Sequence, residues 1–217
     1  MNTNPLAKRI LCYGDSITRW RVPSLKKRFW VHERWTGVLQ DALWSSFEVI
    51  EEWLRGRTTN LYDKDVKGKN WLEYFLPCVY SHLPLDFVII FLWTNNLQKQ
   101  FQENMESIAS SFDFYIKVIQ DASWDYELPV PKVILVSPPY IDWWYLKNDT
   151  IFTESSEQES YTFADAYKQK ADALGLYYFD AAKIVWSGRG DGGDGVHLDQ
   201  EQNRLLWISL ASYIQTL

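Results

Sequence analysis

The stretch Leu11-Cys12-Tyr13-Gly14-Asp15-Ser16-Ile17-Thr18 decides the fold that we expect for this chain. The apolar run from Ile10 to Tyr13 predicts a short buried strand, which ends at Gly14, where the missing Cβ lets the chain turn sharply. Ser16 therefore follows the end of a buried strand, which is where open α/β sheets place their chemistry. The Gly-Asp-Ser turn alone is a weak signal, because Asp15 and Ser16 are also common helix caps.

Apolar patterning predicts that strands and helices alternate along the rest of the chain. The nearly uninterrupted apolar run from Leu85 to Trp93 is typical of a central parallel strand that is buried on both faces. The other expected strands are Phe47 to Leu54, Lys132 to Val136 and Tyr177 to Asp180. Helices are expected over Trp35 to Trp44, over Leu72 to His82, within Glu103 to Asp121, over Ser155 to Leu174, and from Asp199 onward. Five alternations favour a flavodoxin-like three-layer α/β/α sandwich with a five-stranded parallel sheet in the order 2-1-3-4-5.

The composition of the chain limits the domain organisation and the functions that we expect. With 217 residues, 47% of them hydrophobic and 23% charged, a single globular domain over residues 1–217 is expected. The net charge of −6 argues against a nucleic-acid partner. The sequence shows neither a signal peptide nor an apolar run of membrane-spanning length, so we expect a cytoplasmic protein without a membrane partner. Cys12 and Cys78 are expected to be reduced core thiols, and no cofactor or metal is expected because the histidines and cysteines lack zinc spacing.

The predicted strand order brings four loops to one edge of the sheet. Ser16 follows the first strand and Asn95 the third, so they face each other at the switch point, with Gly56 after the neighbouring second strand. Asp194 and His197 come after the fifth strand, on the same edge. Together these loops supply a nucleophile, a base, an acid that orients the base, and amide donors, which is the set that acyl transfer needs. Rival orienting acids are Asp180, Asp191 and Asp199, although the first ends a strand and the last caps a helix.

Four sequence blocks in this order resemble the SGNH (GDSL) hydrolase superfamily, with the closer match in its arylesterase/acyltransferase branch. The blocks are Gly-Asp-Ser-Ile-Thr from Gly14, Gly-Arg-Thr-Thr from Gly56, Thr94-Asn95-Asn96, and Asp194-Gly195-Val196-His197. The resemblance implies that Ser16 is the nucleophile, His197 the base and Asp194 its partner. It also implies an oxyanion hole made by the backbone amides of Ser16 and Gly56 and the side chain of Asn95. The activity it implies is hydrolysis of short-acyl esters, with acyl transfer to alcohols or peroxide.

The chain departs from the family pattern around the expected acyl site. The family's third block reads Gly-x-Asn-Asp, whereas this chain has Trp93 and Asn96 in place of the glycine and the aspartate. Trp20 and Trp53 also stand where close relatives are expected to carry glycine. We therefore expect Trp20, Trp53, Trp93 and Thr94 to contact substrate, with the indoles either narrowing the acyl site or shifting its loops. The missing carboxylate at Asn96 removes an acceptor that supports the site.

The sequence leaves alternatives open for two further segments and for the function of the protein. The basic segment 19–34 is a solvated loop, a pocket wall for anionic substrates, or a subunit contact. Trp143-Trp144-Tyr145 stacks on a sugar or aryl group, or packs against a neighbouring subunit. We expect a serine esterase acting on a small-molecule ester. The alternatives are a carbohydrate O-acetyl esterase and a weakly active or non-catalytic binding protein. Whether the protein is a homo-oligomer is also left open.

Overall fold

All five predicted strands form one parallel sheet. A computed structural model describes residues 4–19, 30–61, 70, 72–92, 94–101, 103–146, 151–188 and 193–217. The strands are β1 (Lys8–Gly14), β2 (Phe47–Trp53), β3 (Phe87–Phe91), β4 (Lys132–Ser137) and β5 (Tyr177–Asp180). Their order is β2-β1-β3-β4-β5 and every neighbouring pair is parallel, so the predicted flavodoxin-like fold is confirmed.

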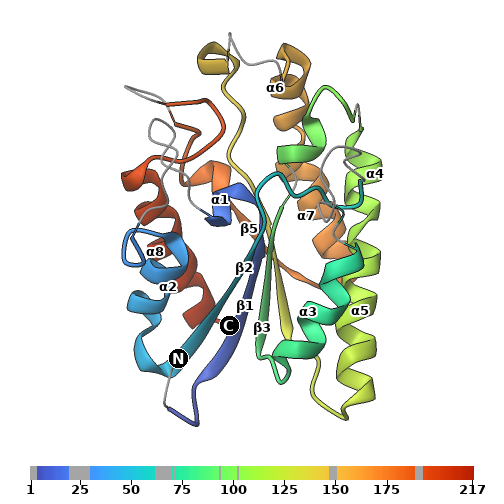
Figure 1. The fold of residues 1–217 in the computed structure, drawn as a ribbon, viewed down its shortest axis with the longest axis vertical. Helices are drawn as coiled ribbons and strands as arrows, with labels where there is room; N and C mark the ends of the chain where they lie inside the picture. Colours follow the sequence, from blue (N-terminus) through green and yellow to red (C-terminus); the bar gives the residue numbers. More distant parts are fainter. Residues whose placement is uncertain are drawn as a thin grey trace.

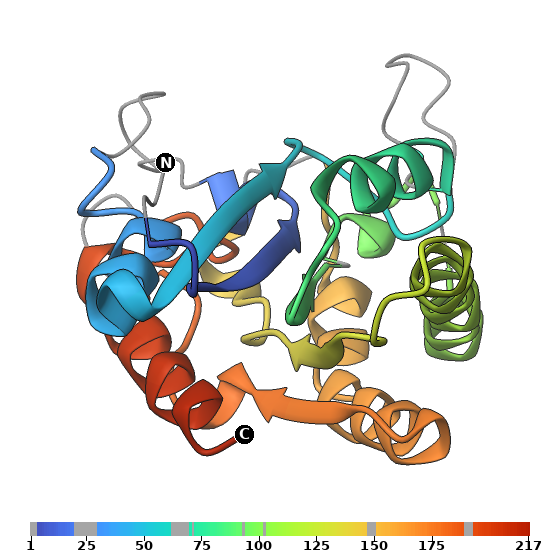
Figure 2. The same ribbon diagram turned by 90° about the horizontal axis from the view of Figure 1, so that it is seen from below.

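Helices cover both faces of the sheet (Figures 1 and 2). One face carries α2 (Trp35–Leu43) and α8 (Gln200–Gln215), and the other carries α3 (Leu72–His82), α5 (Phe112–Asp125) and α7 (Phe163–Leu174). Alternate residues of β1 supply the two cores, because successive side chains of a strand point to opposite faces. Ile10 and Cys12 pack on the α2/α8 side, and Leu11 and Tyr13 pack on the α3/α5/α7 side.

The α2/α8 core is organised by two stacked indoles. Trp35 begins α2 and Trp207 lies in α8, with ring centroids 3.7 Å apart and both side chains fully buried. Phe91, at the end of β3, meets the ring of Trp207 edge-on at 5.5 Å. Since each aromatic side chain buries a large apolar area, this contact fixes both helices beneath the sheet.

The structure divides two helices that the sequence predicted as continuous. The expected helix within Glu103 to Asp121 is α4 (Met105–Ser110) followed by α5, and the expected helix over Ser155 to Leu174 is α6 (Glu154–Ser160) followed by α7. At each break a hydroxyl donates to a carbonyl one turn back, Ser111 to Ile108 at 2.6 Å and Thr162 to Glu159 at 2.8 Å. Such local bonds compete with the regular helical pattern, and hydrophobic periodicity does not reveal them.

Both cysteines are free and buried, as the sequence predicted. Burial and the charge of Glu51 raise the pKa of Cys12 well above its usual value, and burial raises the pKa of Cys78 to about 12. None of the helices in the described ranges is both long and apolar enough to cross a membrane.

Truncation of the stacked pair tests its contribution to stability. Trp207→Ala removes a fully buried indole, so we expect a loss of about 3–5 kcal/mol in the free energy of unfolding, measured by denaturant titration. Trp124→Ala is the matched control, because the side chain of Trp124 is 84% exposed and its loss should change stability by no more than about 0.5 kcal/mol. Equal losses in the two variants would show that the stacked pair does not organise this core.

Candidate active site

Ser16, His197 and Asp194 form one hydrogen-bonded chain at the carboxyl edge of the sheet. Ser16 begins the short helix α1 (Ser16–Arg19), directly beyond the end of β1, and its Oγ lies 2.9 Å from Nε2 of His197. Nδ1 of His197 lies 2.7 Å from Oδ2 of Asp194. The fold therefore joins residues that are 181 positions apart in the sequence. An imidazole held in this way by a carboxylate can accept a proton from a serine hydroxyl.

The Asp194 carboxylate is held ionised. Burial by itself raises its pKa, but the His197 ring and two backbone amides more than offset this, and the pKa of Asp194 falls to about 2. Oδ1 accepts from the amides of Val196 and His197 at 3.1 and 2.8 Å, which leaves Oδ2 for the ring. Because the folded-state pKa is depressed, the stabilisation from this charge is present above the usual carboxyl range and is lost as the pH falls through about 2.

A glycine between the two residues makes this turn. Gly195 has φ +67°, and a Cβ there would lie 2.3 Å from the carbonyl oxygen of Asp142. Its own carbonyl accepts from the amide of Asp142 at 2.8 Å. The turn that presents Asp194 and His197 is thus packed directly against the segment that follows β4. The sequence block contained this glycine, but nothing in the sequence identified the segment against which it packs.

The rival acids have other partners. Asp180 pairs with Lys183 at 3.3 Å and accepts from the hydroxyl of Ser137 at 3.5 Å. Asp199 caps α8, accepting from the amide of Gln202 at 2.8 Å. Asp191 lies outside the described residues. Among the described carboxylates, Asp194 is the one bonded to the His197 ring.

Asn95 links the turn that contains Asp15 and Ser16 to the loop that contains Arg57. It lies in a short 3-10 helix, Thr94–Leu97, and its Nδ2 donates to Oδ2 of Asp15 at 3.1 Å and to the carbonyl of Arg57 at 3.0 Å. Its Oδ1 accepts from Gln98 at 2.8 Å, which fixes the orientation of the amide. Gly56 has φ +72°, so it occupies a turn that suits glycine. Since both Nδ2 hydrogens are engaged, donation to an acyl oxygen requires one of these bonds to be shared or exchanged.

Arg57 supports this loop from beneath, a role that the sequence analysis did not assign to it. Its side chain is 3% exposed, and Nη1 donates to the carbonyl of Gly14 at 3.1 Å. The guanidinium lies over the rings of Tyr13 and Tyr74, at 4.9 and 5.5 Å from their centroids. Burial lowers the pKa of Arg57 from its usual value, with the surrounding rings and the charge of Glu52 working against that shift.

The predicted substrate-contacting residues are only partly described. Trp20 and Trp93 lie outside the described residues, as does most of the basic segment 19–34. Trp53 is half-buried and its indole donates to Oε1 of Glu51 at 2.8 Å, while Thr94 is buried beside Asn95. Arg34, at the end of the basic segment, pairs with the same Glu51 oxygen at 2.6 Å. A substrate contact at these positions stays a prediction.

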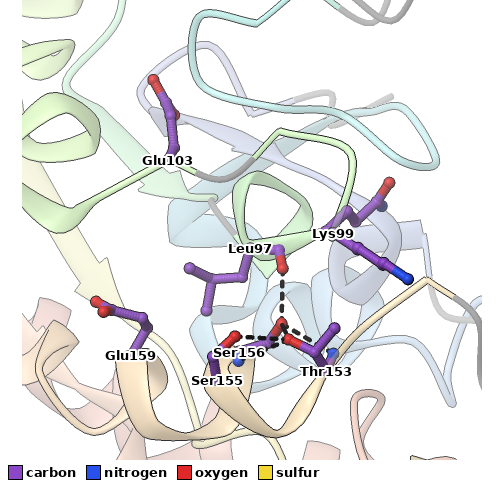
Figure 3. A pocket seen from close by; sticks show the side chains of 8 residues that line it. Leu97, Lys99, Glu103, Thr153, Ser155, Ser156 and Glu159 are labelled. Carbon is purple, nitrogen blue, oxygen red and sulfur yellow. Dashed lines mark hydrogen bonds between the residues drawn. The ribbon is translucent and has the colours of Figure 1, made fainter.

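A polar pocket adjoins the turn that carries Asn95. It has a volume of about 430 Å³, and Figure 3 shows the side chains that line it between Leu97 and α6. Ser156 donates to the carbonyl of Leu97 at 2.8 Å, and Glu103 and Glu159 add negative charge to the lining. Its lining residues do not include Ser16, Asp194 or His197, so the pocket is separate from the candidate catalytic residues.

Known structures resemble this one over nearly its whole length. The aryl esterase of M. smegmatis, in its inhibitor-bound form, is 36% identical with a TM-score of 0.88, and the match covers 97% of this chain and 100% of that chain. The chain belongs to the SGNH (GDSL-type) hydrolase superfamily. A carbohydrate acetylesterase from Sinorhizobium meliloti is 30% identical with a TM-score of 0.87, over 96% of this chain and 99% of that chain.

More distant similarity extends only to the fold. A member of the lipolytic G-D-S-L family from Veillonella parvula is 14% identical, with a TM-score of 0.68 over 97% of this chain and 100% of that chain. No protein-family model matches the chain, and no curated protein matches it either. The two more similar structures are an aryl esterase and a carbohydrate acetylesterase, and both support an esterase function for this SGNH hydrolase.

Glu103 places a carboxylate beside Asn96, where this SGNH hydrolase lacks the expected aspartate. Nδ2 of Asn96 donates to Oε2 of Glu103 at 2.6 Å and to the hydroxyl of Thr59 at 2.9 Å. Its Oδ1 accepts from the amide of Thr59 at 2.9 Å. Glu103, whose side chain contacts Asn96, therefore supplies the negative charge that this chain lacks at position 96. It supports the loop of Gly56 and Arg57 through Asn96 and Thr59.

Exchanging the amide of Asn96 with the carboxylate of Glu103 tests this arrangement. Asn96→Asp places two carboxylates in contact and removes a charge-assisted hydrogen bond, so we expect a loss of at least about 1.5–3 kcal/mol in unfolding free energy, with a lower kcat. The double variant Asn96→Asp/Glu103→Gln restores one donor and one carboxylate, and it should recover most of both losses. Denaturant titration of Asn96→Asp, of Glu103→Gln and of the double variant measures the coupling energy. Simple additivity of the losses would contradict a role for Glu103 as the replacement carboxylate.

Proposed function

We propose that the protein is a serine esterase that hydrolyses short-chain, acetyl-type carboxylic esters through an acyl-enzyme. The observation that supports this most directly is the hydrogen-bonded chain from Ser16 through His197 to Asp194. Its partners lie within the distances that proton transfer requires. The aryl esterase and carbohydrate acetylesterase similarities agree with ester hydrolysis as the reaction class.

In the proposed reaction, Oγ of Ser16 attacks the acyl carbonyl carbon while Nε2 of His197 takes the hydroxyl proton. The negative charge that develops on the acyl oxygen meets donors from the backbone amides of Ser16 and Gly56 and from Nδ2 of Asn95. Collapse breaks the ester C–O bond, and His197 gives its proton to the departing alcohol. Water then repeats the sequence on the acyl-enzyme, releasing the acid and regenerating Ser16. Asp194 keeps Nδ1 protonated and the ring oriented throughout.

Acyl transfer is part of the same proposal. An alcohol or peroxide that attacks the acyl-enzyme in place of water yields a new ester or a peracid, and the same residues serve as base and donors. The partition between water and alcohol is measured directly, by quantifying acid and transferred ester when p-nitrophenyl acetate is supplied together with a simple primary alcohol.

An aromatic rim beside the site favours a second candidate, a carbohydrate O-acetyl esterase. Tyr140, Trp144 and Tyr145 are exposed, Trp144 by 68%, and they belong to the segment whose Asp142 packs on Gly195. Exposed aromatic faces of this kind can stack on sugar rings. The similarity to the carbohydrate acetylesterase of Sinorhizobium meliloti supports this candidate independently.

The catalytic assignment is tested with matched substitutions of aspartate. Asp194→Asn keeps the size of the side chain but reverses the hydrogen bonding to Nδ1, so kcat on p-nitrophenyl acetate should fall by about 10³- to 10⁴-fold. Asp199→Asn preserves an effective helix cap and should leave kcat near that of the parent. Ser16→Ala should lose turnover by several orders of magnitude, because such residues act as a unit. If Ser16→Ala retained most of the rate, both the nucleophile and the acyl-enzyme would be wrong. Absence of turnover by the parent protein would favour the binding-protein alternative.

The carbohydrate candidate is tested by removing the exposed indole at the rim. Trp144→Ala should raise KM for acetylated xylo-oligosaccharides by about 5- to 10-fold, because a stacking contact contributes about 1 kcal/mol, while KM for p-nitrophenyl acetate changes much less. Trp124→Ala, on the distant helix α5, is the control and should change neither KM. Absence of acetate release from the sugar ester by the parent protein would exclude this candidate and leave the aryl-type esterase.

A further inference from the structure

Three potential metal ligands converge at the end of β2, apart from the candidate catalytic residues. One ligand atom each from Glu52, Cys78 and His82 lies within 4.8 Å of the others. Glu52 is the penultimate residue of β2, and Cys78 and His82 lie on α3. Since helix residues four apart share a face, the thiol and the imidazole point to the same side, toward the strand. The sequence separates these ligands across two elements, which is why their spacing gave no zinc signature.

We propose that Glu52, Cys78 and His82 bind a thiophilic divalent transition-metal ion, for which Zn²⁺ is the reference. A thiolate, an imidazole and a carboxylate are the ligand types that zinc takes in proteins. Because the three ligand atoms lie within 4.8 Å of one another, small side-chain movements would bring them to the bond lengths of about 2.0–2.3 Å that zinc requires. A water molecule in the fourth position would complete a tetrahedral set.

The surroundings select against Ca²⁺ and Mg²⁺. These ions need about six oxygen ligands, and the cluster offers a single carboxylate. Arg57 lies close by, since its Nη1 is 3.5 Å from the carbonyl oxygen of Glu52 and its guanidinium stacks on Tyr74. That positive charge opposes an ion held by electrostatic attraction alone. A metal that forms a covalent bond to sulfur is therefore favoured.

Hydrogen bonds hold the side chains of the cluster in place. Nε2 of His82 lies 2.9 Å from Oε1 of Glu52, and the hydroxyl of Tyr74 donates to the other carboxylate oxygen at 3.1 Å. Metal binding replaces the first contact and keeps the second as outer-shell support. It also displaces the thiol proton of Cys78 into solvent, and it requires the ring proton of His82 on Nδ1 so that Nε2 can bind the metal. The Glu52 and His82 side chains are 21% and 25% exposed, so an ion can reach the buried sulfur past them.

A metal here would join β2 to α3 directly before the loop of Gly56 and Arg57. Because the three ligands meet only in the folded chain, binding should stabilise the native state by mass action. The expected effect is structural, and it is separate from the proposed esterase chemistry. It can therefore be measured whether or not the esterase proposal holds.

Cobalt provides a spectroscopic test. Co²⁺ is titrated into the untagged full-length protein after chelator treatment, and a thiolate-to-cobalt charge-transfer band should appear and saturate at one ion per chain. Zn²⁺ should then displace the cobalt and abolish the band, whereas excess Mg²⁺ should not. Cys78→Ser should lose the band, and Cys12→Ala, which removes the other buried thiol, should keep it.

A thermal melt gives the second readout. Zn²⁺ should raise the Tm of the parent and of Cys12→Ala but not that of Cys78→Ser. His82→Gln should bind zinc more weakly by at least the roughly 10- to 100-fold that loss of an outer-shell residue costs. His82→Gln also replaces Cys78→Ser in both experiments if the latter fails to fold. The proposal is overturned if the parent develops no charge-transfer band, if the band survives in Cys78→Ser, or if His82→Gln binds cobalt and zinc as tightly as the parent.

Discussion

The hydrogen bond between Ser16 and His197 is the interaction on which this structure's proposed chemistry depends. It joins the turn after β1 to the turn before α8, across 181 positions of sequence. The parallel sheet brings these turns to one edge, because all its strands end on the same side. Each partner is also fixed locally. Asp15 accepts from the amide of Ile17 at 2.9 Å and shapes the serine turn, and Asp194 holds the histidine ring.

A second set of contacts makes the site rigid before any substrate binds. Asn95 bonds to Asp15 on one side and to the carbonyl of Arg57 on the other, so three loops share one amide group. Asn96 and Glu103 support the same loop through Thr59, and the buried guanidinium of Arg57 supports it from the core. Donors fixed in advance need little reorganisation as charge develops, which is the main source of electrostatic stabilisation in enzymes. The proposed oxyanion hole depends on this preorganisation.

The sequence predicted the sheet order and the meeting of Ser16 with His197 because both follow from rules with a local signature. Apolar runs mark parallel strands, and the strand order decides which loops share an edge. It did not predict the breaks at Ser111 and Thr162, which arise from hydroxyl bonds within one turn. Nor did it predict Glu103 beside Asn96, or the meeting of Glu52 with the thiol and imidazole of α3, since both depend on the packing of segments that lie apart in sequence.

The account makes Ser16 the residue that carries the acyl group, and peptide mapping of the acid-quenched enzyme tests this most directly. The protein is mixed with excess p-nitrophenyl acetate, quenched during turnover, digested and analysed by tandem mass spectrometry. The account predicts an acetyl ester on Ser16, present during turnover and lost once substrate is exhausted. An acetyl group on another side chain that forms and decays at the turnover rate, with Ser16 unmodified, would contradict it.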